Sequence, residues 1–180
     1  PLQDAQEAIR FVRCNAKKWQ LNSKKIGVIG FSAGGHLAST LAVRYNDETY
    51  KSNDTTSAKP DFTVLVYPVI SMEDDISHEG SKKRLLGSNP SKEAIEKFSN
   101  ELHVDSLTSP TFIVHASDDK VVTVKNSISY YLALQENKVP AELHVFQIGK
   151  HGFFLGRKDT TSEYWTSQCS NWLLLNNYIN

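Results

Sequence analysis

The chain has 180 residues, and its 20 Lys and Arg balance 20 Asp and Glu to a formal net charge of zero. At this length we expect one domain with a core of its own. Without surplus positive charge, neither nucleic acid nor an anionic membrane surface is expected as a partner. The 39% hydrophobic and 22% charged residues are typical of a soluble globular protein and exclude a disordered chain.

Strands alternate with helices along the sequence. Apolar residues recur at helical spacing over residues 2–19, and the β-branched run at 25–31 indicates a buried strand. The elements that follow are a helix at 33–45, a strand at 62–69, a short helix at 91–98, a strand at 111–115, a helix at 123–137, a strand at 142–148 and a helix at 162–178. This order predicts an α/β fold in a single domain over 1–180, with a mainly parallel sheet and helices on both faces. Residues 71–109 form an insertion long enough to act as a lid.

The sharpest motif is Gly-Phe-Ser-Ala-Gly at 30–34, which fits G-x-S-x-G between a predicted strand and a predicted helix. A nucleophile on such a strained turn needs small neighbours, and we expect Gly30 and Gly34 to leave room for strand and helix to approach. Ser32 would then be exposed at the carboxyl edge of the sheet. The N–H of Ala33, at a helix N-terminus, would face a developing oxyanion.

A serine nucleophile needs a histidine base and an orienting carboxylate, in the chain order Ser, Asp or Glu, His. His151 lies between glycines in the loop after the last predicted strand. The other histidines fall on a helix, in the insertion or in strands: His36, His78, His103, His115 and His144. Asp118 and Asp119 both follow the strand at 111–115, and their position in the chain does not separate them. The one not used would be a cap or a turn residue.

Short stretches along nearly the whole chain match one family pattern. They are Asp4-Ala5-Gln6 with Ile9-Arg10, GFSAGGH at 30–36, YPVI at 67–70, SHEG at 77–80, SNE at 99–101, PTFIVHASDDKVV at 110–122 and Gly152-Phe153. They resemble the α/β-hydrolase superfamily, and within it the bacterial acetyl-xylan-esterase-like and feruloyl-esterase-like enzymes. In that family the acid stands two residues before a Val-Val or Val-Pro pair, which implies Asp119 rather than Asp118.

The resemblance implies a serine esterase that acts through an acyl-enzyme on a small acyl ester or an acylated sugar, with acetyl on a xylan-type sugar as the expected group. Ser32, Asp119 and His151 would be catalytic and Ala33 an oxyanion donor. Phe31 and Phe153 are candidates for substrate binding. The chemistry calls for no metal and no cofactor. Two other functions stay open: a serine peptidase of the prolyl-oligopeptidase type, and a non-catalytic interaction protein with the hydrolase fold.

Complete members of the family have further strands upstream and a His-Gly-Gly-like loop that supplies a second oxyanion amide. No His-Gly-Gly occurs in this sequence, which starts at Pro1. We therefore expect it to correspond to the C-terminal two-thirds of such an enzyme, without its N-terminal strands. The sequence leaves the compartment open, and also the oligomeric state, with a homo-oligomer among the alternatives.

Overall fold

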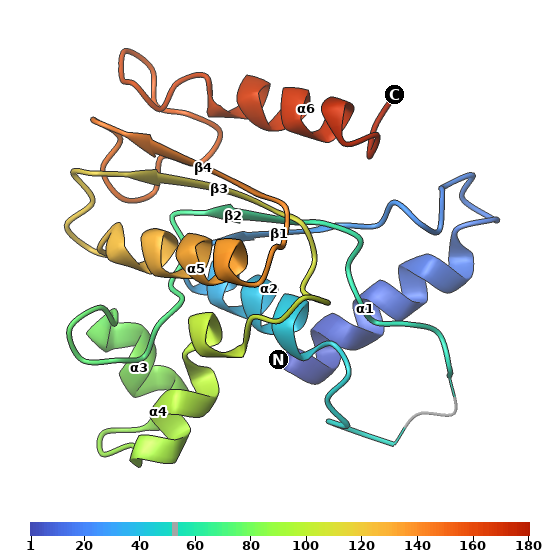
Figure 1. Cartoon of the computed structure of the whole chain (residues 1–180), viewed down its shortest axis with the longest axis horizontal. Coiled ribbons are helices and arrows are strands. Elements are labelled where there is room, and N and C mark those ends of the chain that lie inside the picture. The colour runs from blue at the N-terminus through green and yellow to red at the C-terminus, as the bar shows by residue number, and fades with distance from the viewer. Residues whose placement is uncertain (52–53) are drawn as a thin grey trace.

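A four-stranded parallel sheet forms the centre of the molecule, seen here in a computed structural model that describes residues 1–51 and 54–180 (Figure 1). Its strands are β1 (Val28–Phe31), β2 (Thr63–Val66), β3 (Thr111–Ala116) and β4 (Ala141–Phe146). They lie side by side in chain order, and every pair is parallel. All four carboxyl ends therefore meet at one edge of the sheet. The predicted parallel sheet is confirmed.

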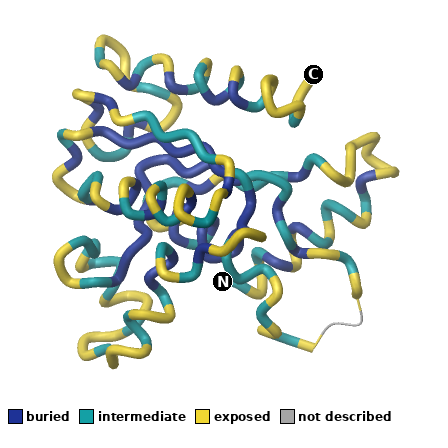
Figure 2. The backbone as a smooth tube through the Cα atoms, viewed as in Figure 1, coloured by how far each residue is buried: buried dark blue, intermediate teal, exposed yellow. Residues whose placement is uncertain are grey.

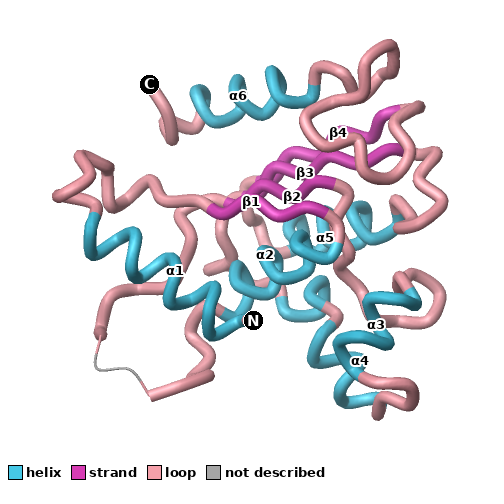
Figure 3. Tube along the Cα trace, turned by 180° about the vertical axis from the view of Figure 1, so that it is seen from behind, coloured by secondary structure: helices cyan, strands magenta, loops and turns pink. Residues whose placement is uncertain are grey.

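Helices cover both faces of this sheet (Figures 1 and 3). They are α1 (Leu2–Asn15), α2 (Ala33–Arg44), α3 (Glu79–Leu86), α4 (Lys92–Phe98), the short 3-10 helix η1 (Asn100–His103), α5 (Lys125–Glu136) and α6 (Trp165–Leu175). Helix α6 lies on one face, and α2 and α5 lie on the other, with α1 packed against α2. Within the described residues, no helix combines the length and apolar character needed to cross a membrane.

The core lies on both sides of the two central strands, whose residues are all buried (Figure 2). Successive side chains of a strand point to opposite faces. Val64 and Val66 accordingly pack with Trp165 and Trp172 beneath α6, whereas Leu65 packs with residues of α2 and α5. This burial on both faces explains the uninterrupted apolar runs in the sequence.

The insertion contains α3 and the 3-10 helix η1 in addition to the predicted helix at 91–98. Helix α3 was not expected, because its residues are largely charged and show no apolar stripe. Neither α3 nor α4 contains a buried residue. They meet the body through a small apolar cluster in which Leu86, Ile95 and Phe98 pack on Val69, Met72 and Val122. Closure of this segment over a site stays a prediction.

Candidate active site

Ser32 occupies a strained turn between β1 and α2. Its φ of 50° and ψ of −122° are angles that residues with a side chain rarely adopt. The turn is held from β2 and the loop behind it: the Ser32 N–H donates to the Val66 carbonyl at 3.0 Å, and the Val69 N–H donates to the Ser32 carbonyl at 3.0 Å. The backbone thus has the geometry that the G-x-S-x-G motif predicts.

Two glycines allow this turn to pack closely. One is Gly30 of the motif, and the other is Gly35 rather than the expected Gly34. A Cβ on Gly30 would lie 2.4 Å from the Gly34 carbonyl oxygen, so Gly30 has no room for a side chain. A Cβ on Gly34 would meet nothing within 4 Å, so a side chain there is not excluded by packing. The second close approach is instead at Gly35, where a Cβ would lie 2.6 Å from Pro68 Cβ.

Three loops at the carboxyl edge bring Ser32, His151 and Asp119 together. His151 Nε2 lies 2.9 Å from Ser32 Oγ, and its Nδ1 lies 2.7 Å from Asp119 Oδ2. A carboxylate only accepts, so Nδ1 carries the proton and Nε2 is free to accept from the serine hydroxyl. This is the arrangement that a nucleophile, its general base and an orienting acid require.

The Asp119 carboxylate is fully buried and surrounded by donors. Its Oδ1 accepts from the N–H groups of Val121 and Val122, both at 2.9 Å. Burial alone raises the pKa of Asp119, but hydrogen bonds from His115, His151 and the two amides outweigh it and lower the pKa from 3.8 to about 2. The group is therefore ionised at any pH at which a histidine base works.

Asp118 lies in a turn, as one alternative expected, and it also has a role that the sequence did not indicate. Its Oδ1 accepts from the N–H groups of Gly149 at 2.9 Å and Lys150 at 2.7 Å. The Lys150 amide in particular keeps the pKa of Asp118 below its ordinary value. Asp118 thus fixes the loop that carries His151, while Asp119 contacts its ring.

Aromatic side chains support the His151 ring. Tyr67, the residue after β2, places its ring edge-on at 4.9 Å from the His151 ring, and Phe153 packs on Tyr67 at 4.7 Å. Phe153 is buried in the core, and half-buried Phe31 lies 6.0 Å from Tyr67. Substrate binding by Phe31 and Phe153 stays a prediction. Tyr67 lies in the YPVI stretch that matches the family pattern, but no role was expected for its side chain; a Tyr-Pro pair after a buried strand was the usable signal.

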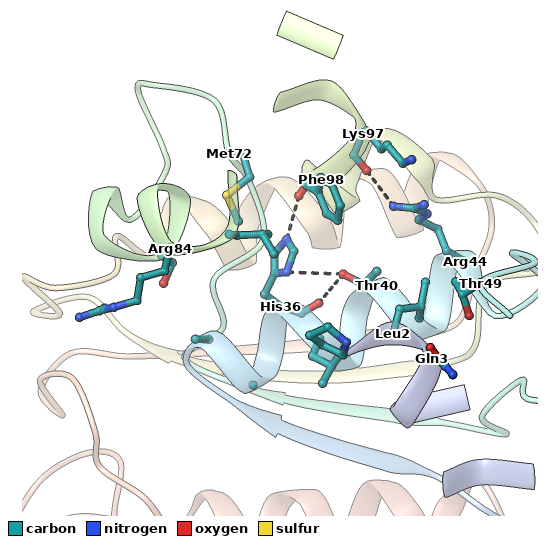
Figure 4. Close-up of a pocket in the computed structure, with 16 residues that line it drawn as sticks. Leu2, Gln3, His36, Thr40, Arg44, Thr49, Met72, Arg84, Lys97 and Phe98 are labelled. Atoms are coloured by element: carbon teal, nitrogen blue, oxygen red, sulfur yellow. Dashed lines mark hydrogen bonds between the residues drawn. The ribbon is translucent and has the colours of Figure 1, made fainter. Parts of the chain in front are cut away.

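A cavity of about 730 Å³ opens beside the turn (Figure 4). Ala33 and Gly34 at the start of α2 line it, together with apolar residues of the insertion such as Leu85 and Phe98. Across it, His36 Nε2 donates to the Phe98 carbonyl at 2.8 Å and ties α4 to α2.

Among the described residues nothing accepts from the Ala33 N–H, which leaves that donor available. The described residues also hold no cluster of three or more His, Cys, Asp or Glu that could bind a metal.

A sequence profile of the BD-FAE family matches residues 1–134. The chain belongs to the BD-FAE family. The BD-FAE match includes Ser32 and Asp119, and His151 lies beyond its end.

Solved and curated proteins agree with this assignment. The structure of an acetyl ester-xyloside bifunctional hydrolase from Caldicellulosiruptor lactoaceticus is 43% identical, with a TM-score of 0.93, over all of this chain and 67% of that one. An acetylxylan esterase of Xylanibacter ruminicola is 35% identical over 96% of this chain and 35% of its own length. Endo-1,4-beta-xylanase B of Butyrivibrio fibrisolvens is 41% identical over 84% of this chain and 24% of its own.

The chain thus spans between a quarter and about a third of the curated relatives' length. The α/β-hydrolase fold and the resemblance to sugar-ester esterases of that superfamily, both expected from the sequence, are confirmed.

Proposed function

We propose that the protein is a serine esterase that removes small acyl groups, acetyl above all, from acylated xylan-type sugars. The observation that carries this proposal is the unbroken hydrogen-bonded series from Ser32 Oγ through His151 to the buried Asp119 carboxylate, built on a strained turn in a BD-FAE chain. Asp119 is ionised, and the two ring nitrogens of His151 face the serine hydroxyl and the acid in the orientation that acyl transfer needs.

In the first half of the reaction, Ser32 Oγ attacks the ester carbonyl carbon while His151 Nε2 takes the hydroxyl proton. The negative charge that develops on the carbonyl oxygen is stabilised by the Ala33 N–H at the N-terminus of α2. Asp119 stabilises the imidazolium across its 2.7 Å contact. His151 then gives its proton to the sugar oxygen, which leaves as an alcohol.

In the second half, His151 removes a proton from water, and the hydroxide attacks the acyl-enzyme carbonyl. Collapse of the second tetrahedral intermediate returns the proton to Ser32 Oγ and releases the carboxylic acid. Every proton in these steps passes through His151 Nε2. This single route explains why a 2.9 Å contact to the serine, and a fixed tautomer, matter so much.

The substrate class is supported by what the relatives are called: one is an acetylxylan esterase and another an acetyl ester-xyloside hydrolase. The cavity beside Ala33 has the volume of a common ligand site, roughly 300 to 1,000 Å³, but Ser32, His151 and Asp119 do not line it, so the proposed substrate class rests on the relatives.

Hydrolysis of p-nitrophenyl acetate by the wild type, Ser32→Ala and Ser167→Ala tests the proposal. Ser167 is exposed on α6, far along the chain from the turn, and serves as a matched serine control. We expect Ser32→Ala alone to abolish turnover. Acetate release from acetylated xylo-oligosaccharides then tests the substrate class. Equal rates in all three proteins would refute the esterase, and cleavage of a proline-containing peptide without acetate release would favour a peptidase.

A further inference from the structure

A second imidazole contacts the acid of the proposed triad. His115 is fully buried in β3, and its Nε2 lies 3.3 Å from Asp119 Oδ2 and 3.0 Å from the Val122 carbonyl oxygen. Its Nδ1 lies 2.7 Å from Ser127 Oγ on α5. The proposed mechanism assigns no task to this side chain, although burying an imidazole at this cost in hydration calls for an explanation.

The surroundings of His115 settle which nitrogen carries a proton. Both oxygens near Nε2, the Asp119 carboxylate and the Val122 carbonyl, can only accept hydrogen bonds. Nε2 must therefore be protonated: its N–H donates to the Val122 carbonyl at 3.0 Å, and Asp119 Oδ2 lies 3.3 Å from the same nitrogen. The Ser127 hydroxyl can donate or accept, so Nδ1 is satisfied whether the ring is neutral or charged. In either state His115 donates toward the acid.

This contact completes the donor set around Asp119. Oδ1 accepts two backbone N–H groups, and Oδ2 faces two imidazoles, His151 at 2.7 Å and His115 at 3.3 Å. A carboxylate with all of its lone pairs engaged cannot rotate without breaking several hydrogen bonds at once. The Oδ2 atom that faces His151 is therefore fixed in place.

We propose that His115 is a positioning residue of the active site: through its Nε2–H it fixes the Asp119 carboxylate in the orientation that His151 requires, and it withdraws part of the negative charge on Oδ2. This inference rests on the proposed function. Within the described residues, no hydrogen bond or ion pair of His115 reaches Ser32 or a residue that lines the cavity, so His115 acts on the reaction through Asp119.

One consequence for the pH profile distinguishes this role from a purely structural one. Without the His115 donor, Oδ2 holds more charge and attracts protonated His151 more strongly, so the acid limb of the kcat/KM profile moves to higher pH. Among the described residues, Tyr67 from the end of β2 is a further ionisable group beside Asp119 and His151, while the Asp118 carboxylate in the turn before Asp119 binds the Gly149 and Lys150 amides. None of these is altered by changing His115.

The decisive experiment is a double-mutant cycle with p-nitrophenyl acetate. His115→Phe keeps the ring volume without a donor, His115→Gln keeps an N–H donor, and each is made in the wild type and in Asp119→Asn. We expect His115→Phe to lower kcat about 10- to 100-fold, the range of a hydrogen bond to a charged group, with KM unchanged. His115→Gln should recover part of the loss. In the Asp119→Asn background His115→Phe should cost less than about 3-fold, because both act through one group.

His144→Phe is the matched control. His144 lies on the adjacent strand β4 and contacts the carboxylate of Glu142 at 2.6 Å, but it takes no part in the triad. We expect its kcat and pH profile to equal those of the wild type. The proposal fails if His115→Phe lowers kcat equally in the wild type and in Asp119→Asn. It also fails if a folded His115→Phe variant keeps the acid limb of its kcat/KM profile unchanged. Either result would make His115 a packing residue only.

A measurement without turnover separates this inference from the proposed function. Nitrogen-15 NMR of the imidazoles should show His115 protonated at Nε2, and the His151 Nδ1 proton resonance should shift in Ser127→Ala, which keeps the His115 ring and removes only its hydroxyl partner. A His115 protonated at Nδ1 alone overturns the inference. An inactive wild type with the expected NMR pattern overturns only the esterase.

Discussion

The carboxyl edge of the sheet and the insertion are both built from segments that follow strands, yet they are held very differently. At the edge, each loop is bound to a neighbouring segment: Ser32 to Val66 at the end of β2 and to Val69 in the loop after it, and Asp118 to Gly149 and Lys150 after β4. In the insertion, α3 and α4 bury no residue of their own.

This difference matches what each region would do. Acyl transfer requires catalytic atoms held within about half an ångström, which only cross-bonded loops on a rigid sheet provide. A segment that contacts one side of a cavity needs less precision and can vary without disturbing the triad. The boundary between the two lies at Asn100, whose side-chain amide donates to the His36 carbonyl and to Ser39 Oγ on α2.

The largest effect should separate the two adjacent carboxylates of the edge. Asp119→Asn removes the charge that orients His151, and kcat should fall roughly 10³- to 10⁴-fold. Asp118→Ala frees the loop that carries His151 but leaves the triad intact, so we expect a loss of about 10-fold or less. Steady-state kinetics on p-nitrophenyl acetate compares them. A larger loss for Asp118→Ala would exchange the two assignments.

The next effect concerns the two glycines of the motif. Gly30→Ala forces a Cβ against the Gly34 carbonyl and should lower the free energy of unfolding by about 3 kcal/mol. Gly34→Ala has open space and a helical backbone, so it should be neutral or stabilising by about 0.5–1 kcal/mol. Urea unfolding measures both. If both substitutions lowered the free energy of unfolding equally, the close contact between Gly30 and the Gly34 carbonyl would be contradicted.

The third prediction uses the lowered pKa of Asp119, about 2 in the folded protein against 3.8 ordinarily. Between these values the unfolded chain binds the extra proton, so stability rises with pH across this window and is complete above about pH 4. The contribution is about 2 kcal/mol. The difference in unfolding free energy between wild type and Asp119→Asn should therefore shrink as pH falls from 4 to 2. A difference that stays constant would contradict the donor set around Asp119.

The smallest effect belongs to the insertion. Ser91 caps α4 by accepting from the Ala94 N–H at 3.2 Å, and Ser91→Ala should destabilise that helix by about 1 kcal/mol. Because α4 lies outside the cross-bonded edge, kcat should not change. Hydrogen exchange of α4 amides, measured beside turnover, tests this. A tenfold loss of kcat would place the insertion within the catalytic framework.

The features that the sequence predicted are local ones. Periodicity located the strands and most helices, and the G-x-S-x-G motif located Ser32, because these signals lie within a few neighbouring residues. His151 followed from its position after the last strand. Choosing Asp119 over Asp118 needed the family resemblance, since both occupy the same loop and differ only in which way the backbone directs them.

The features that were missed depend on contacts between distant segments. Gly35 is small because Pro68 packs on it from the loop after β2. In the sequence, His115 is a strand residue with no sign of a role. Its contact with Asp119 exists because the turn after β3 brings Asp119 back toward the strand. Helix α3 was not predicted because it contains no buried residue and lacks the apolar stripe by which a helix is recognised.

The hydrogen bond between Ser32 and His151 joins residues 119 positions apart, from one outer strand of the sheet to the other. Closing so long a stretch of chain is among the slowest steps in forming a native structure. Helices and the paired central strands can form earlier, whereas the nucleophile meets its base only when all four strands are in register. During refolding, recovery of turnover should therefore lag behind recovery of helical circular dichroism, so the reaction itself would report the completion of the fold.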